Sequence, residues 1–188
     1  MEYNAKIFDE QRWLIKFFVY HLTYYRELRR TPNLTVDHAY FWKFTVDAHL
    51  LQATIYWCMV FGSRKSNPTH WKHLAVSEND AATLHETFRK AVLKRTGFTS
   101  LEWDKYWNEM VDFRNKYVVH KDNFQGHVPH FGKALNVAQA YDTWVRKLIS
   151  PDYNDEPRLR WAVDEAKKSI RPFLKDLAKL KKRKNPPL

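Results

Sequence analysis

The chain has 188 residues, of which 44% are hydrophobic and 16% aromatic, enough to bury a core in one domain over residues 1–188 and too many for a disordered chain. Its formal net charge of +11 makes a polyanion the first partner to consider. The presence of only 4 glycines argues against a glycine-rich phosphate loop.

The single cysteine and the short apolar runs indicate the cellular compartment of the protein. The single cysteine, Cys58, lies in an apolar run, so we expect a buried thiol in a reducing environment. Residues 1–10 are too acidic and too polar for a secretory signal. The most apolar run, 53–61, is far shorter than the roughly 20 residues that cross a bilayer. We therefore expect a cytoplasmic protein without a membrane partner.

Apolar residues that recur at steps of three and four predict helices along the whole chain. The expected helical ranges are 4–30, 36–61, 77–97, 100–120, 134–149 and 158–183. No segment alternates apolar and polar residues as a half-buried strand does. The sequence therefore predicts an all-α, up-and-down bundle of five to six helices with mostly short connections.

The first two helices are the most apolar. His21 lies on the apolar face of the first, where we expect a histidine that is hydrogen-bonded within the core. The expected inward stripe of the second helix consists of Phe41, Phe44, Ala48, Leu51, Ile55 and Met59. The end of this helix is apolar nearly all round, which predicts a place at the centre of the bundle.

The third and last helices carry much of the positive charge. Ser77 is the expected N-cap of the third helix, and Gly97 ends it. Its outer face carries Arg89, Lys90, Lys94 and Arg95, either as a solvated surface or as phosphate contacts. In the last helix, Pro172 is expected to cause a kink or a break. Residues 179–188 form a basic tail that either follows nucleic-acid phosphates or only adds solubility.

The helix over 100–120 holds the candidate site. Trp103, Trp107, Met110 and Tyr117 share its apolar face, and Arg114 falls within the same stripe. A guanidinium there needs a partner. Two interpretations are open. Arg114 pairs with a core carboxylate such as Asp47, or it binds an anion together with Asn115 and His120.

The second interpretation has a specific chemistry. Arginine donates two parallel hydrogen bonds to phosphate, and histidine exchanges protons near neutral pH. Asn115 can donate to a non-bridging phosphate oxygen or hold the ring of His120. This set suits metal-independent RNA cleavage. Because a six-residue step on an ideal helix separates two side chains by about 120°, two copies in a two-fold dimer would assemble one site better than a single chain.

Residues 113–122, Phe-Arg-Asn-Lys-Tyr-Val-Val-His-Lys-Asp, resemble the signature of HEPN domains, and most closely that of the abortive-infection branch. The resemblance implies an α-helical, dimeric, metal-independent endoribonuclease with Arg114, Asn115 and His120 at the dimer cleft, acting as a toxin or phage-defence effector. It also implies an antitoxin protein as a partner. Some toxins of this family carry a modifiable tyrosine where this chain has Asp122. An inactive helical module that binds nucleic acid or a protein is the alternative.

Charged and histidine residues near the motif complete the prediction. Lys116, Lys121, Asp122, His127 and His130 are expected to contact the substrate, with the 127–130 loop bordering the cleft. His70 and His73 form a second pair with the same three-residue spacing. Both pairs lie in predicted loops, and neither has a cysteine or carboxylate that completes a known zinc pattern. We therefore expect no metal and no cofactor.

Overall fold

The computed structural model describes residues 2–31, 39–119, 126–150, 153 and 155–184, and within them it is helical. Its α-helices are α1 (Ala5–Arg30), α2 (Ala39–Phe61), α3 (Glu78–Thr96), α4 (Ser100–Asp112), α5 (Phe131–Leu148) and α6 (Leu159–Lys184). Short helical turns are η1 (Arg64–Ser66), η2 (Trp71–Leu74) and the π-helical η3 (Phe113–Val119). Among the described residues the only β-type pairing is an isolated bridge between Tyr3 and Ala75. The predicted all-α bundle is confirmed.

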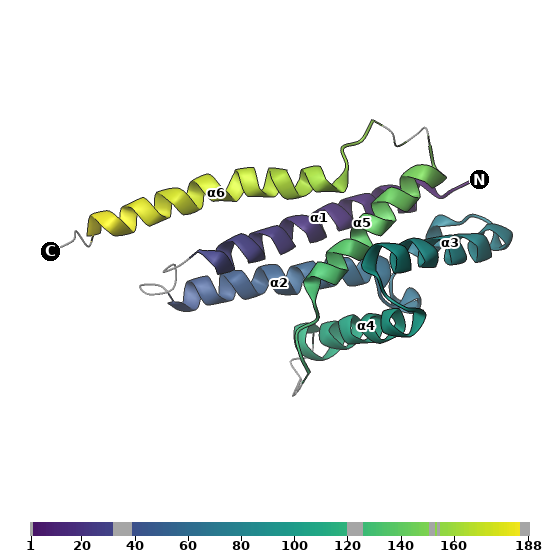
Figure 1. Ribbon diagram of the computed structural model, residues 1–188, viewed down its shortest axis with the longest axis horizontal. Coiled ribbons are helices and arrows are strands. Elements are labelled where there is room, and N and C mark those ends of the chain that lie inside the picture. Colours follow the sequence, from purple (N-terminus) through teal and green to yellow (C-terminus); the bar gives the residue numbers. More distant parts are fainter. Residues whose placement is uncertain (1, 32–38, 120–125, 151–152, 154, 185–188) are drawn as a thin grey trace.

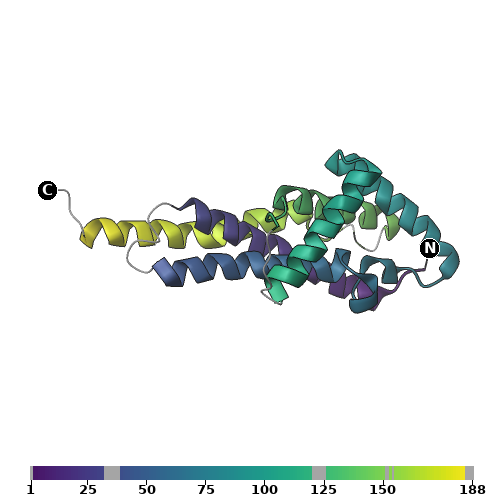
Figure 2. The ribbon, with the colours of Figure 1, turned by 90° about the horizontal axis from the view of Figure 1, so that it is seen from below.

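The helices form two groups (Figure 1). Helix α1 packs against α2 on one side and α6 on the other, and the three lie along the long axis, with α2 running opposite to its neighbours. The view turned by 90° shows the same three helices continuing together beyond the rest of the molecule (Figure 2). At the other end, α3 packs against α5, and α4 lies beside the end of α2. The core lies where the two groups meet.

Large aromatic side chains fill this core. Trp57, Phe61, Phe88 and Tyr141 come from three helices, and each is at most 2% exposed. Burial of each such side chain contributes about 1.5–3 kcal/mol to folding. The Tyr141 hydroxyl donates to Gln11 Oε1 at 2.5 Å, so this buried polar pair is satisfied. The predicted central position of the end of α2 is therefore confirmed.

The predicted inward stripe of α2 is wrong, because none of its six residues is buried. Phe41 and Phe44 are 63% and 67% exposed. In the second half of the helix the predicted residues Leu51, Ile55 and Met59 are half-buried, and the buried face is that of Leu50, Ala53 and Trp57. The first half of α2 lies in the projecting part of the three-helix group, where fewer helices surround it (Figure 1). An apolar pattern alone does not show how far along a helix its partners extend.

Capping residues explain several helix ends. The Ser77 hydroxyl accepts the Asp80 backbone N–H at 3.2 Å, as predicted. Gly97 ends α3 in the left-handed region with φ of 72°, which strains a residue with a side chain. Helix α4 begins at Ser100, as predicted, and Thr99 is its N-cap. Helix α5 begins at Phe131, three residues before the expected start.

The last helix has the expected length and lies one residue later in the chain than predicted. Pro172 lies inside α6, and the helix continues to Lys184 without dividing there. Residues 179–184 of the predicted basic tail are therefore helical, and 185–188 lie outside the described residues. None of the described helices combines the length and the hydropathy needed to cross a membrane.

Candidate functional site

Arg114 and Asn115 lie in η3, directly after α4. The widened turn shifts the phase of the helix, so Phe113 becomes the buried anchor and Tyr117 is 42% exposed. The predicted inward position of Tyr117 is therefore wrong, and its ring instead stacks on Phe113 with centroids 5.0 Å apart. The π-turn fixes Phe113 in the core and leaves the next two side chains half-buried at its edge.

The Arg114 guanidinium is oriented by its neighbour. Its Nη1 donates to Asn115 Oδ1 at 2.7 Å. A guanidinium has five N–H donors, so this bond leaves most of them for other partners. Because the Asn115 oxygen already accepts, its amide nitrogen remains a donor. The two side chains together present donors suited to an anion.

A cavity of about 140 Å³ lies beside this pair. Its lining comes from the end of α2, the segment after it, α4 and η3, and consists of Cys58, Gly62, Ser63, Val111, Arg114 and Asn115. Burial raises the pKa of the Cys58 thiol to about 12, against the opposing effect of the nearby Arg114 charge. The thiol is therefore protonated and inert as a nucleophile at neutral pH.

Arg114 does not pair with Asp47. Among the described residues, no carboxylate forms an ion pair with Arg114. A half-buried guanidinium to which no described carboxylate is paired is poised to accept an anion. The structural interpretation of Arg114 as half of a core ion pair with Asp47 is therefore wrong.

The other predicted site residues lie outside the described lining of the Arg114 cavity or outside the described residues. Lys116 is exposed, and its ammonium binds Asp112 at 3.0 Å. His120, Lys121 and Asp122 lie outside the described residues. His127 and His130 are both exposed, and neither is part of the described lining of the Arg114 cavity. The structure thus brings together Arg114 and Asn115, and the contribution of the histidines stays a prediction.

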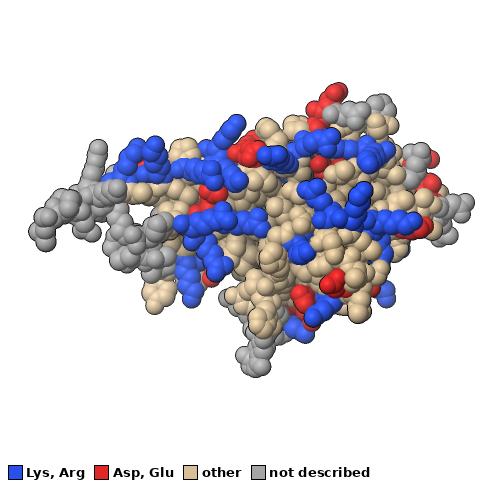
Figure 3. Space-filling view, viewed as in Figure 1, with Lys and Arg blue, Asp and Glu red and all other residues tan. Residues whose placement is uncertain are grey.

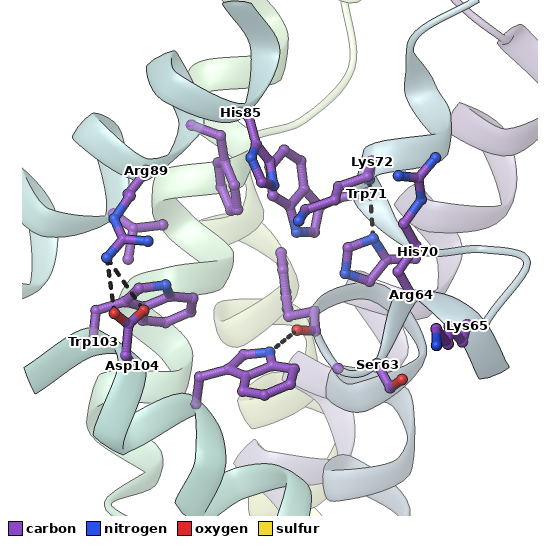
Figure 4. Close-up of a pocket in the computed structure, with 15 residues that line it drawn as sticks. Ser63, Arg64, Lys65, His70, Trp71, Lys72, His85, Arg89, Trp103 and Asp104 are labelled. Atoms are coloured by element: carbon purple, nitrogen blue, oxygen red, sulfur yellow. Dashed lines mark hydrogen bonds and ion pairs between the residues drawn. The ribbon is translucent and has the colours of Figure 1, made fainter. Parts of the chain in front are cut away.

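A second and larger cavity of about 420 Å³ lies next to the first (Figure 4). Most of the side chains that line it are cationic or aromatic, and those labelled in the figure are Ser63, Arg64, Lys65, His70, Trp71, Lys72, His85, Arg89, Trp103 and Asp104. We call it the cation–aromatic pocket. Gly62 and Ser63 line both cavities. A Cβ at Gly62 would lie 2.5 Å from the Cys58 carbonyl oxygen, so the shared wall requires glycine.

Only part of this pocket is predictable from the sequence. Arg89 lies on the basic face that was predicted to contact solvent or phosphate. Trp71 and Lys72 lie in a segment expected to be an irregular loop, which folds into η1 and η2. Trp103 was expected to face the core but is half-buried. The available signal was the group of Arg64, Lys65 and Lys72 close in sequence to Trp71.

The described histidines do not form a metal site. His70 is buried, its Nδ1 accepts the Lys72 backbone N–H at 3.2 Å, and burial together with nearby cations lowers its pKa to about 3. The His70 and His73 rings are 6.2 Å apart. No group of three or more histidine, cysteine or acidic residues suited to a metal occurs in the described part of the chain. His70 therefore acts as the cap of η2.

Comparisons with models of known protein families, with curated proteins and with solved structures find no match to this chain.

Proposed function

We propose that the chain is a HEPN-like endoribonuclease that cleaves RNA without a metal ion, with Arg114 and Asn115 binding the scissile phosphate. The observation that carries the proposal is the cavity at Arg114, where the guanidinium contacts Asn115 and no described carboxylate neutralises it. A phosphodiester supplies the missing negative charge and accepts several N–H donors at once. The resemblance of residues 113–122 to the HEPN signature points to the same residues.

The proposed reaction is an internal transfer of the phosphoryl group. The 2′-oxygen attacks the adjacent phosphorus while its proton passes to a base. The bond from phosphorus to the 5′-oxygen breaks, and that oxygen takes up a proton. The products are a 2′,3′-cyclic phosphate and a 5′-hydroxyl. Arg114 offsets the charge that develops on the non-bridging oxygens, and we assign the proton transfers to His120.

The reaction needs two proton-transfer groups, and this need favours a homodimer. One neutral histidine acts as the base and one protonated histidine as the acid, so two copies of His120 meet the need of a single phosphodiester. We infer that the substrate is cytoplasmic RNA and that the protein acts as a toxin or phage-defence effector restrained by an antitoxin protein. These assignments follow from the HEPN resemblance of the motif.

Positive charge on the surface supports a second candidate. Lys and Arg side chains form rows over one face of the molecule, with few acidic residues between them (Figure 3). Such a face binds nucleic acid without cleaving it. In that case the chain is an inactive helical module, and Arg114 contributes to affinity alone.

The reaction type can be tested on purified protein with single-stranded RNA and transfer RNA in EDTA. We expect products that end in 2′,3′-cyclic phosphate, and no cleavage of RNA that carries 2′-deoxy sugars at the cleavage positions. His120→Ala should be inactive, whereas His73→Ala, which changes a half-buried histidine outside the Arg114 cavity, should keep full activity. Cleavage of the deoxy-substituted RNA, or full activity of His120→Ala, would contradict the proposal.

A further inference from the structure

The cation–aromatic pocket has an uncompensated positive charge. Arg64, Lys65 and Lys72 line it, and none of them forms an ion pair with a described carboxylate. The fourth cation, Arg89, is bound to Asp104 at 3.0 Å. Asp104 is the one carboxylate in the described lining. The pocket therefore carries about three positive charges without a described carboxylate partner, two on the exposed side chains of Arg64 and Lys65 and one on the half-buried Lys72, and this charge favours an anionic ligand.

The positive charge of the pocket contributes to lowered pKa values of Lys72 and His85. Burial and then the Arg64 and Arg89 charges lower the pKa of Lys72. Burial and then Lys72, Arg89 and Arg64 lower the pKa of His85. These cations repel one another across the pocket, and a bound anion would relieve that repulsion.

The second feature of the pocket is its aromatic surface. Trp71 and His85 stack with ring centroids 5.2 Å apart, and Trp103 lies across the pocket from them (Figure 4). Trp107 completes the wall and is held by a bond from its Nε1 to the Phe61 carbonyl at 2.7 Å. Within the described part of the chain, the indole N–H groups of Trp71 and Trp103 have no hydrogen-bond partner. Flat rings with free donors suit a heterocyclic base.

Cations and aromatic rings occur on both sides of the cavity. Figure 4 shows Arg64, Lys65 and Lys72 on one side of the cavity and Trp103 with Arg89 and Asp104 on the other. The Lys72 ammonium lies 5.6 Å from the centre of the Trp71 ring, so a ligand that spans the cavity meets cations and one indole on one side and a second indole, Trp103, on the other. The volume of about 420 Å³ is in the range of small-molecule sites.

We propose that the cation–aromatic pocket binds a nucleotide, with its phosphate at Arg64, Lys65 and Lys72 and its base against the tryptophans. Since Gly62 and Ser63 line both this pocket and the Arg114 cavity, we assign the nucleotide to the RNA strand held at Arg114. That second assignment rests on the proposed ribonuclease function. Nucleotide binding by the pocket does not.

Binding is tested first with AMP, ATP and inorganic pyrophosphate by calorimetry on the full chain. Arg64→Gln/Lys72→Gln should weaken binding of all three at least about tenfold. The matched control Lys94→Gln/Lys105→Gln removes two exposed cations from α3 and α4, outside the pocket, and should leave affinity unchanged. Absence of saturable binding, or an equal loss in both double variants, would overturn the proposal. Circular dichroism and thermal unfolding establish that each variant is folded.

The aromatic wall is tested separately. Trp103→Leu should weaken AMP and ATP binding about tenfold and leave pyrophosphate binding unchanged, because only the nucleotides carry a base to stack. Equal effects on nucleotide and pyrophosphate, or no effect on either, would overturn the assignment of the base to this wall.

The source of the nucleotide is tested with RNA. If the pocket holds part of the strand, a short oligoribonucleotide competes with AMP, and Arg64→Gln/Lys72→Gln raises KM for RNA cleavage with little change in kcat. Failure of RNA to compete would overturn the strand assignment. Arg114→Gln should bind AMP as well as the unaltered chain does, so loss of the proposed ribonuclease function and loss of nucleotide binding are separate results.

Discussion

Two arginines show how one residue type serves stability or function in this chain. Arg146 is 8% exposed, and the protein itself satisfies its donors. Its Nε binds Asp142 at 3.2 Å, and its two terminal nitrogens donate to the carbonyls of Tyr153, Glu156 and Pro157 at 2.8–2.9 Å. Arg114 instead has one described partner, Asn115. Arg146 therefore ties the segment before α6 to α5, and Arg114 keeps its donors for a ligand.

This contrast predicts different costs of mutation. Arg146→Met should lower the free energy of unfolding by about 3–5 kcal/mol, because it leaves the Asp142 charge buried without its partner. Arg114→Met should change it by less than about 1 kcal/mol, because the described group that loses its partner, Asn115 Oδ1, is only half-buried. Urea unfolding of both variants measures the difference. Equal losses would show that Arg114 is structural.

The His21–His49 pair makes stability depend on pH. The two Nδ1 atoms are 3.0 Å apart, so one ring donates to the other and both cannot be protonated without opposing N–H groups. Burial and the His49 charge lower the pKa of His21 to about 4, and burial lowers that of His49. The predicted hydrogen bond of His21 is confirmed, and its acceptor or donor is His49. The ring is half-buried and not fully inside the core.

The sign of the pH effect follows from these lowered pKa values. The unfolded chain binds protons that the folded pair rejects, so stability is highest above the usual histidine pKa of about 6.5. It should fall as pH decreases from about 6.5 toward about 4. His21→Phe/His49→Phe should show a smaller fall in urea unfolding between about pH 7.5 and about pH 5. An unchanged pH dependence would mean that other groups, such as His70 and His85, account for it.

At the level of elements, the sequence was most informative where helices are long and capped. The bounds of α1 and the cap Ser77 follow directly from apolar spacing and capping chemistry. The buried ion pair of Asp142 and Arg146 was not predicted, because charges four residues apart normally indicate an exposed helix face. The π-turn at Phe113 was also not predicted, since its hydrogen-bond shift has no signature in the residue pattern.

Pro172 offers a test of the last helix. The proline lacks the N–H that a helix interior requires, yet α6 continues on both sides of it. Pro172→Ala should therefore raise the free energy of unfolding by about 1–3 kcal/mol, since proline costs about 3 kcal/mol relative to alanine in a helix. Thermal unfolding against Lys168→Ala, an exposed change in the same helix, measures the gain. A lower melting temperature would mean that the structure depends on the proline.

At the scale of the whole molecule, the candidate site combines segments that are far apart in the sequence. The wall between the two cavities is Gly62 and Ser63, one cavity contains Arg114, and the other contains Lys72 and His85. The motif at residues 113–122 pointed to Arg114 and Asn115. No spacing rule connects that motif to η1 and η2, because their approach depends on how α2, α3 and α4 pack.

The net charge of +11 predicts salt-sensitive RNA binding. If Arg64, Lys65, Lys72 and Arg114 contact four phosphates of a single strand, log K should fall with log salt with a slope of about −3. Arg64→Gln/Lys72→Gln should reduce the slope by about 1.4. Fluorescence anisotropy with a labelled oligoribonucleotide measures both slopes. A slope unchanged by the double variant would place the bound phosphates elsewhere on the basic surface.

The central claim is that the Arg114 guanidinium binds the scissile phosphate, and the most direct measurement is kcat/KM for RNA cleavage in EDTA by Arg114→Gln and by Arg160→Gln. Arg160 is exposed at the start of α6, outside both cavities, so its variant controls for the loss of one positive charge. We predict a fall of about 10²-fold or more for Arg114→Gln and an unchanged value for Arg160→Gln. Equal activity of the two variants would contradict the account.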